Sequence, residues 1–239
     1  SQATGLLWQT LLPLASGTTD NVVPRFNTPV GTEEPAPVQT SGLLISDTGA
    51  IQSTPTGGNA RGASAVDLQP VRGAVTQVAS GVNSVISGGL NNTASGIESV
   101  VGGGSANIAS GTDSTIGGGT TNTANNTNCT VGAGSINLAT GLYATVAGGL
   151  TNQATNTNSI VSGGQSNVAS GQQSTVIGGA SNQATGTNSI AGGSTNLASA
   201  LSSVAIGTSS TASGAHAWAM GSRAVADKHG QMANASGFF

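Results

Sequence analysis

Few side chains of this chain have the types and spacing that catalysis or metal binding requires. His216 and His229 are the only histidines, and Asp227 precedes His229 by two residues. Neither histidine has a cysteine or carboxylate cluster beside it at the spacing of a metal site. Serine is so frequent that no single hydroxyl stands out as the nucleophile of an Asp–His pair. We therefore predict that the protein is not an enzyme and has no catalytic residue, metal or cofactor.

The single cysteine and the glycine runs likewise do not indicate a reactive or ligand-binding site. Cys129 cannot form an intrachain disulfide. It stands where most neighbouring repeats have serine, which indicates a small buried side chain. The glycine runs at residues 102–104 and 117–119 lack the lysine and the helix of a phosphate-binding loop.

If the chain binds a partner, specificity would come from positions that vary between repeats. Such positions include Ile97, Glu98, Leu142, Tyr143, Gln172 and Gln173. Among the larger side chains, we take Tyr143, His216 and Trp218 as candidate contacts for such a partner. His216 and Trp218 lie in the final 14-residue repeat, so the alternative for both is a role in capping the array.

The composition does not support a conventional globular core. Of 239 residues, only 5% are charged and 3% aromatic, whereas 38 are glycine. Small side chains bury little apolar surface, so either a regular backbone ladder supplies the order or the chain is disordered. Strict periodicity argues against disorder. The formal net charge of −3 provides no basic surface for phosphates, so nucleic acid is not an expected partner.

The motif Ala-Ser/Thr-Gly-x-x-Ser recurs along the chain with small variations. Its first alanine falls at Ala79, Ala94, Ala109, Ala124, Ala139, Ala154, Ala169, Ala184, Ala198, Ala212 and Ala226. Successive alanines follow a 15-residue period up to Ala184 and a 14-residue period thereafter. This spacing predicts ten coils between Ala79 and Val225.

Further columns of residues recur in phase within the coils. A small residue occupies the sixth position of each coil, as at Ser84, and in the longer coils an aliphatic residue such as Ile86 stands two positions later. This alternation predicts a short strand with one buried face, and the glycine pair that follows marks a turn. We therefore predict an all-β parallel solenoid with two strands per coil. The extra residue of the 15-residue coils is expected in the Gly-Gly-x-x-Asn turn.

An asparagine stands two residues before the next alanine in eight consecutive coils. The column consists of Asn92, Asn107, Asn122, Asn137, Asn152, Asn167, Asn182 and Asn196. In one interpretation each amide bonds its counterpart one coil away and forms a structural ladder. In the other, the column is an exposed stripe that binds a glycan or an ice lattice. We favour the ladder, because stacking demands one residue type in every coil whereas a ligand rarely does.

The last coils resemble the head repeats of trimeric autotransporter adhesins. Residues 198–211 (ASALSSVAIGTSST) and 212–225 (ASGAHAWAMGSRAV) follow the 14-residue head-repeat pattern, and residues 203–207 match its Ser-Val-Ala-Ile-Gly centre. The upstream coils resemble the 15-residue variant found in phage tail fibres. The resemblance covers about residues 79–237. It implies a left-handed parallel β-roll in which three identical chains pack around a common axis.

The thinness of each coil supports the same expectation of a homotrimer. Burying one Val or Ile contributes about 1.5–3 kcal/mol, whereas ordering one residue costs about 1–2 kcal/mol of backbone entropy. A coil with one or two aliphatic residues would therefore gain from a core shared among three chains.

The resemblance implies a structural and receptor-binding part of a viral tail fibre, located in the virion. Its partners would be further copies of itself, a host-surface receptor such as a glycan, and other tail proteins contacted through residues 1–78. The alternative is the head of a secreted bacterial adhesin at the cell surface. A remote alternative, ice binding, is suggested by threonine-rich coils, although these threonines do not form phased rows. They include Thr120, Thr121, Thr123, Thr127 and Thr130.

The repeats over residues 79–225 are flanked by two segments of different character. Residues 1–78 carry no repeat and several prolines, so we expect an irregular connector, with a strand-turn-strand pattern at residues 41–51. Residues 61–81 resemble lead-in segments that precede such repeats in phage fibre proteins, which favours the viral hypothesis. The apolar stretch at residues 6–14 is too short to span a bilayer, so no membrane insertion is expected.

Residues 226–239 break the repeat and end on two phenylalanines. They resemble the end of fibre shafts that precede a C-terminal chaperone removed by self-cleavage. In that case Phe239 lies close to a maturation site. The alternative is that this segment is the start of a cap.

Overall fold

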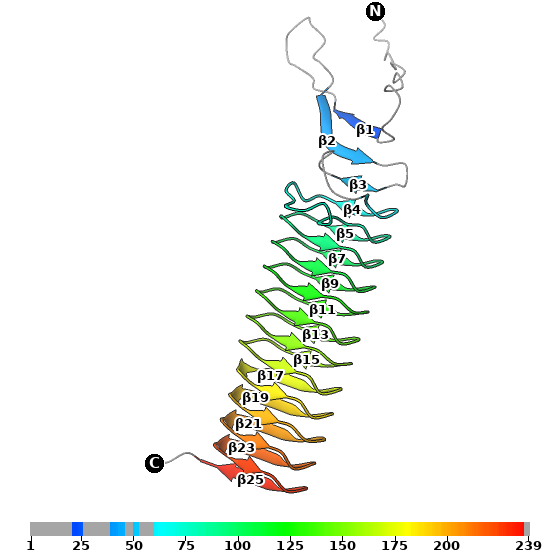
Figure 1. Ribbon diagram of the computed structural model, residues 1–239. Coiled ribbons are helices and arrows are strands. Elements are labelled where there is room, and N and C mark those ends of the chain that lie inside the picture. Colours follow the sequence, from blue (N-terminus) through cyan, green and yellow to red (C-terminus); the bar gives the residue numbers. More distant parts are fainter. Residues whose placement is uncertain (1–20, 26–38, 46–49, 53–59, 237–239) are drawn as a thin grey trace, which may run out of the picture.

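The fold is all-β. The computed structural model describes residues 60–236 together with 21–25, 39–45 and 50–52. These residues form a parallel β-solenoid of about 11 turns of about 15 residues, and no helix occurs among them. Figure 1 shows the turns stacked into a rod. The predicted parallel solenoid is therefore confirmed.

Two sheets run along the rod. In spatial order, the long sheet consists of β1 (Asn21–Arg25), β2 (Gln39–Ile45), β3 (Ile51–Gln52), β4 (Val66–Asp67), β5 (Val85–Ile86), β7 (Val100–Val101), β9 (Thr115–Ile116), β11 (Thr130–Val131), β13 (Thr145–Val146), β15 (Ile160–Val161), β17 (Thr175–Ala180), β19 (Ile190–Ser194), β21 (Val204–Thr208), β23 (Trp218–Ser222) and β25 (Met232–Ala235). The short sheet consists of β6 (Thr93–Ala94), β8 (Ile108–Ala109), β10 (Thr123–Ala124), β12 (Leu138–Ala139), β14 (Gln153–Ala154), β16 (Val168–Ala169), β18 (Gln183–Ala184), β20 (Leu197–Ala198), β22 (Thr211–Ala212) and β24 (Val225–Ala226). From β5 onward the chain alternates between the sheets, so each turn contributes one strand to each.

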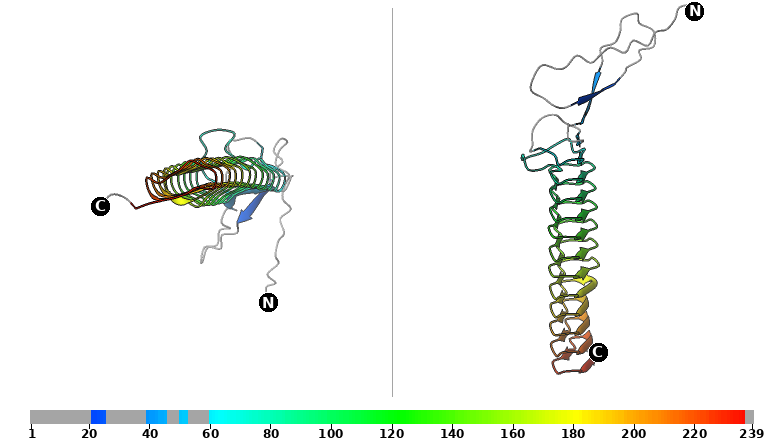
Figure 2. Two further views of the ribbon diagram at one scale, coloured as in Figure 1. Left: turned by 90° about the horizontal axis from the view of Figure 1, so that it is seen from below. Right: turned by 90° about the vertical axis from the view of Figure 1, so that its right-hand side faces the viewer.

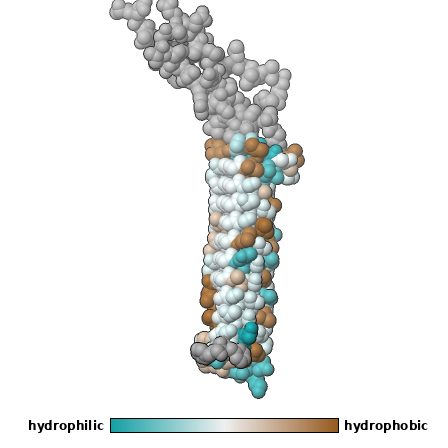
Figure 3. Space-filling model, turned by 90° about the vertical axis from the view of Figure 1, so that its left-hand side faces the viewer, coloured by the Kyte–Doolittle hydropathy of each residue, from teal (hydrophilic) through white to brown (hydrophobic). Residues whose placement is uncertain are grey.

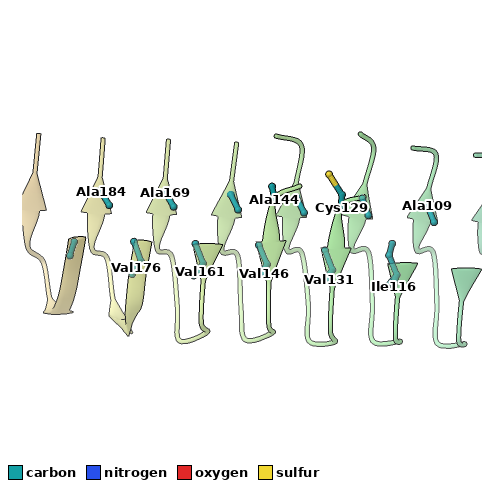
Figure 4. Close-up of a cluster of buried hydrophobic side chains, with 14 of the residues drawn as sticks. Ala109, Ile116, Cys129, Val131, Ala144, Val146, Val161, Ala169, Val176 and Ala184 are labelled. Atoms are coloured by element: carbon teal, nitrogen blue, oxygen red, sulfur yellow. The ribbon is translucent and has the colours of Figure 1, made fainter. Parts of the chain in front are cut away.

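Each turn buries its own small core between the two sheets. In the turn that contains β5 and β6, the inward side chains are Ser84, Ile86, Asn92 and Ala94, and all four are fully buried. Figure 4 shows the alanine column of the short sheet opposite the valine and isoleucine column of the long sheet. A single chain therefore buries this inner core by itself. The outer faces of the sheets are what remain exposed, as the flattened cross-section in Figure 2 illustrates.

The change from 15-residue to 14-residue turns occurs at one site in the long sheet. In the pairing of β17 with β19, Val176 lies opposite Ala191, which keeps the longer period, but Gly179 lies opposite Gly193, which follows the shorter one. The additional residue is therefore Ile177, which directly precedes the predicted Gly-Gly-x-x-Asn turn, or Gly178, which is the first residue of that turn. Without this residue the strand continues straight, and β19, β21 and β23 have five residues instead of the two of β5 to β15.

The stacked sheet begins upstream of Ala79, within the segment expected to be an irregular connector. β3 and β4 are parallel to the later strands, and β2 pairs antiparallel with β3, which confirms the two strands predicted at residues 41–51. The turn predicted between them lies outside the described residues. At the other end, β25 stacks on β23 within the predicted cap segment. Residues 237–239, including Phe239, lie outside the described residues.

A charged cluster ends the aliphatic column of the core on its N-terminal side. Asp67 in β4 pairs with Ile86 of the next turn and is fully buried in the same column. Its Oδ2 atom accepts from Arg61 Nε at 3.1 Å and from an Arg72 guanidinium nitrogen at 3.2 Å. The aliphatic column thus ends on a buried ion pair, while the buried alanines of the core continue upstream through Ala65 and Ala50.

One glycine column recurs in all ten coils, because the turns stack too closely there for a side chain. Its members are Gly89, Gly104, Gly119, Gly134, Gly149, Gly164, Gly179, Gly193, Gly207 and Gly221. Gly149 has φ +97°, and a Cβ atom on it would lie 2.1 Å from the carbonyl oxygen of Gly164. By contrast, a Cβ atom on Gly118 would have no neighbour within 4 Å.

We predict that Gly149→Ala destabilises the solenoid severely and that Gly118→Ala does not. The first substitution adds a strained backbone angle and an overlap with the next turn, at a cost of about 3 kcal/mol or more. The second should change the free energy of unfolding by less than about 0.5 kcal/mol. Thermal and urea unfolding followed by circular dichroism would measure both, and equal effects would contradict the stacking constraint.

Candidate functional site

The eight asparagines form a hydrogen-bonded column inside the solenoid. In a typical turn, Asn137 Oδ1 accepts from the backbone N–H of Asn152 at 3.0 Å. Asn137 Nδ2 donates to the carbonyl oxygen of Ala133 in its own turn at 3.1 Å and to that of Gly149 in the next turn at 2.9 Å. Nδ2 also lies 3.1 Å from Asn122 Oδ1 in the preceding turn. The side chain of Asn137 therefore connects three turns.

The column extends beyond the asparagines at both ends. Gln69 is fully buried; its Oε1 accepts from the N–H of Asn92 at 2.8 Å and its Nε2 donates to the carbonyl oxygen of Asn92 at 2.9 Å. At the other end, the N–H of Ser210 donates to Asn196 Oδ1, and Ser210 Oγ donates to the carbonyl oxygen of Gly221. All eight asparagines are at most 1% exposed, so the interpretation of the column as an exposed binding stripe is wrong.

Each complete turn has two corners, and at each corner a residue adopts positive φ. At the first corner, which leads from a short-sheet strand to the next long-sheet strand, these residues include Asn83, Tyr143 and His216. At the second corner they include Ile136. Positive φ is uncommon for residues other than glycine and unfavourable for branched and bulky ones. Stacking, rather than local preference, thus sets the backbone at these positions.

The first corner forms an exposed ridge along the rod, which we call the variable edge. It comprises residues 82–83, 97–98, 112–113, 127–128, 142–143, 157–158, 172–173, 187–188, 201–202 and 215–216. All six variable positions identified from the sequence, from Ile97 to Gln173, lie on it. Because its side chains point away from the core, they can change without altering the stacked columns.

The structure does not bring the three candidate receptor contacts together. Tyr143 and His216 both lie on the variable edge, but five turns separate them, which corresponds to about 24 Å. Trp218 lies on the outer face of the long sheet, where it pairs with Met232 of the next turn. Tyr143 is 52% exposed and Trp218 is 45% exposed. They are separate surface features.

The two histidines contact each other in an edge-to-face arrangement. Their ring centroids are 5.3 Å apart and the ring planes meet at 80°. Asp227 and Lys228 are exposed close to them in the sequence. In the part of the chain that the structure describes, no group of three or more His, Cys, Asp and Glu residues could hold a metal ion.

Cys129 is fully buried, and its thiol donates to the carbonyl oxygen of Gly141 in the next turn at 2.9 Å. Burial raises the pKa of the Cys129 thiol above its ordinary value. A thiol held protonated in the core is a poor nucleophile. Its geometry is that of a small core side chain.

Sequence reasoning missed the asparagines that replace glycine around Tyr143. The third position of the repeat motif is glycine in most turns, but it is Asn126 and Asn156 in the two turns that flank Tyr143. Asn126 Nδ2 donates to the carbonyl oxygen of Thr140 at 3.0 Å, and Asn156 Nδ2 to that of Ser170 at 2.9 Å. The departure of two alternate turns from the motif was the signal that could have revealed them.

Charged residues are nearly absent from the stacked turns. Between residues 73 and 222 the only charged residues are Glu98 and Asp113, and both lie on the variable edge. Figure 3 shows a shaft surface that is mostly close to neutral hydropathy, with separate hydrophobic and hydrophilic patches. Within the described residues, no helix is long and apolar enough to cross a membrane.

No protein-family model matches this chain, and comparison with curated proteins finds no similar sequence.

We predict a graded loss of stability for substitutions of Asn137. Asn137→Ser should cost least, because Ser210 shows that a hydroxyl can accept and donate in this column. Asn137→Ala leaves the N–H of Asn152 without its acceptor and removes the side-chain bonds to Ala133 and Gly149, at a cost of about 3 kcal/mol. Asn137→Asp should cost most at neutral pH, because a carboxylate cannot donate to these carbonyl oxygens. Urea unfolding would give the order.

The pH dependence of stability provides a control for these Asn137 variants. A protonated carboxyl group can donate, so folding should raise the pKa of the introduced aspartate. The stability of Asn137→Asp, relative to Asn137→Ala, should therefore rise as the pH falls. A pH-independent difference between the two variants would contradict the proposed role of the amide as a donor.

Proposed function

We propose that the chain forms the shaft and receptor-binding part of a homotrimeric viral tail fibre, with its turns wound as a left-handed β-roll. The main support is the long, charge-free outer face of the long sheet, which fits self-association around an axis. The resemblance of residues 198–225 to trimeric head repeats, and of the longer turns to phage fibre repeats, supports the viral context. The proposal assigns no catalytic step and no cofactor to the chain.

The outer face of the long sheet is a continuous column of β-branched and apolar side chains. The column consists of Val85, Val100, Thr115, Thr130, Thr145, Ile160, Thr175, Ile190, Val204, Trp218 and Met232. Several of its larger groups are exposed, with Ile160 41%, Trp218 45% and Met232 71% exposed, whereas Val204 is only 9% exposed. A solvent-facing sheet normally has polar residues at these positions. The column therefore has the character of a surface that a partner covers.

Threefold symmetry explains why this face would lack charge. On an axis, each residue meets its own copies at the same level, so any charged residue would repel itself. The long-sheet column contains neither charged residues nor amides; the outer column of the short sheet is also uncharged, but it includes the amides of Gln153 and Gln183. The variable edge holds Glu98 and Asp113, so the proposed trimer would have this edge away from the axis. In this arrangement the variable edges of three chains face outward and can contact a receptor.

We predict that the protein is a trimer in solution and that Thr145→Lys dissociates it. Light scattering after gel filtration should give three times the 22.8 kDa chain mass. Three lysine ammonium groups brought close to an axis would repel one another, so the Thr145→Lys variant should elute as a monomer.

Gln153→Lys is the matched control, because Gln153 lies on the outer face of the short sheet in β14, the strand that directly follows β13. It should remain trimeric. A compact monomer of the unmodified protein would refute the trimer, and dissociation by Gln153→Lys with retention of the Thr145→Lys trimer would assign the interface to the other sheet.

The viral and the bacterial hypotheses predict different neighbouring genes. For a tail fibre, we expect genes for tail or capsid proteins beside this one. For a bacterial adhesin head, the full gene would encode an upstream signal peptide and a downstream coiled coil with a membrane anchor. Sequencing the surrounding region therefore decides between virion and bacterial cell surface, and finding the adhesin arrangement would refute the tail-fibre proposal.

Ice binding remains the weaker alternative. Thr115, Thr130 and Thr145 do lie in register on adjacent turns, a phased row that we did not expect from the sequence. However, Val100 and Ile160 interrupt the row after three turns. A thermal hysteresis assay would test this alternative, and measurable hysteresis would favour it over a trimer that buries this face.

A further inference from the structure

Tyr143 is the only tyrosine of the chain and the only aromatic residue on the variable edge apart from His216. It is 52% exposed and has φ +58°. A bulky residue with positive φ costs roughly 1–2 kcal/mol relative to glycine. Because equivalent corners share this backbone angle, Tyr143 stands out by its exposed aromatic ring, which makes the position a candidate for binding.

Two asparagines flank Tyr143 on the same column of the variable edge. Asn128 lies one turn before and Asn158 one turn after, each at about the strand spacing of 4.8 Å. Backbone bonds fix this stacking, since the N–H of Tyr143 donates to Thr127 at 3.1 Å and the N–H of Asn158 donates to Leu142 at 2.8 Å. The ring therefore lies on a ridge between two amides.

The amides of Asn128 and Asn158 are available for a ligand. Both residues are exposed, and their side chains make no hydrogen bond to any described part of the protein. The neighbouring Asn126 and Asn156 have a different role, because their amides bond backbone atoms. Asn126 Oδ1 accepts from the N–H of Thr127 at 2.8 Å, and its Nδ2 bonds the turn that carries Tyr143. One pair of asparagines thus supports the ridge while the other faces solvent.

The charge around Tyr143 restricts the class of ligand. Its nearest charged neighbour on the edge is Asp113, two turns away, and no lysine or arginine occurs between residues 73 and 222. Nothing at this site could neutralise a carboxylate, sulfate or phosphate group. An aromatic face with free amide donors and acceptors suits an uncharged ligand that has both apolar C–H faces and hydroxyl groups.

We propose that Tyr143, Asn128 and Asn158 form a binding site for a neutral glycan, in which a sugar ring stacks on the tyrosine and its hydroxyls bond the two amides. This inference rests on the proposed receptor-binding function and specifies where on the shaft, and for which chemical class, binding occurs. Three copies of the site on one trimer would raise the avidity for a surface that displays many identical glycans.

The test uses the full chain and an array of neutral and acidic glycans. The unmodified protein should bind neutral glycans, and calorimetry with the best of these should give its affinity. Tyr143→Asn should weaken binding by about tenfold or more, because it removes the stacking surface. This variant should fold well, since asparagine already occupies the same corner position at Asn83 and Asn188. Asn128→Gly, which also tolerates positive φ, should weaken binding as well.

Asn188→Gly is the matched control for Asn128→Gly, because Asn188 occupies the same corner position three turns away from Tyr143 and is also exposed. It should leave the affinity unchanged. Binding to acidic glycans only, no glycan binding, or unchanged affinity in Tyr143→Asn would each overturn the proposed site. The oligomeric state is measured separately, so a trimer without glycan binding refutes this site alone, whereas a monomer that binds glycans refutes the trimeric fibre.

Discussion

The axial hydrogen bond between successive turns is the interaction on which the rest of the structure depends. In both sheets, a backbone N–H of one turn donates to a carbonyl of the next, as from Thr130 to Ala144. This bond sets the turns one strand spacing apart, about 4.8 Å, and leaves no room for a Cβ atom at Gly149 and its equivalents. Because every turn meets the same constraint, the same residue types recur in columns.

Stacking also explains how so few apolar atoms suffice for a core. Each of the longer turns buries one alanine, one small residue, one aliphatic residue and one asparagine. The asparagine contributes hydrogen bonds between turns rather than buried apolar area. Asn137 bonds the turn before and the turn after it, so its amide makes neighbouring turns depend on each other. A one-dimensional array gains stability from such neighbour terms instead of from a single large core.

The sequence predicts the features that stacking repeats and misses those that occur once. The 15-residue period, followed by a 14-residue one, predicts both sheets and the buried asparagine column, because identical residues must lie one above another. Asp67 and Gln69 end their columns on the N-terminal side without any repeat, so no period could reveal them. The positive φ of Ile136 and Tyr143 was equally hidden, because the neighbouring turns impose it against the preference of the residue itself.

The inward columns must keep the same residue types in every turn, whereas the variable edge can change from turn to turn. At Tyr143 the bonds that hold the corner are made by backbone atoms of Thr127 and Leu142, and the side chain takes no part in them. Glu98, Gln173 and His216 can therefore occupy equivalent corners in other turns. A repeat that fixes its fold through inward columns and main-chain bonds leaves its outer edge free to acquire a binding site one turn at a time.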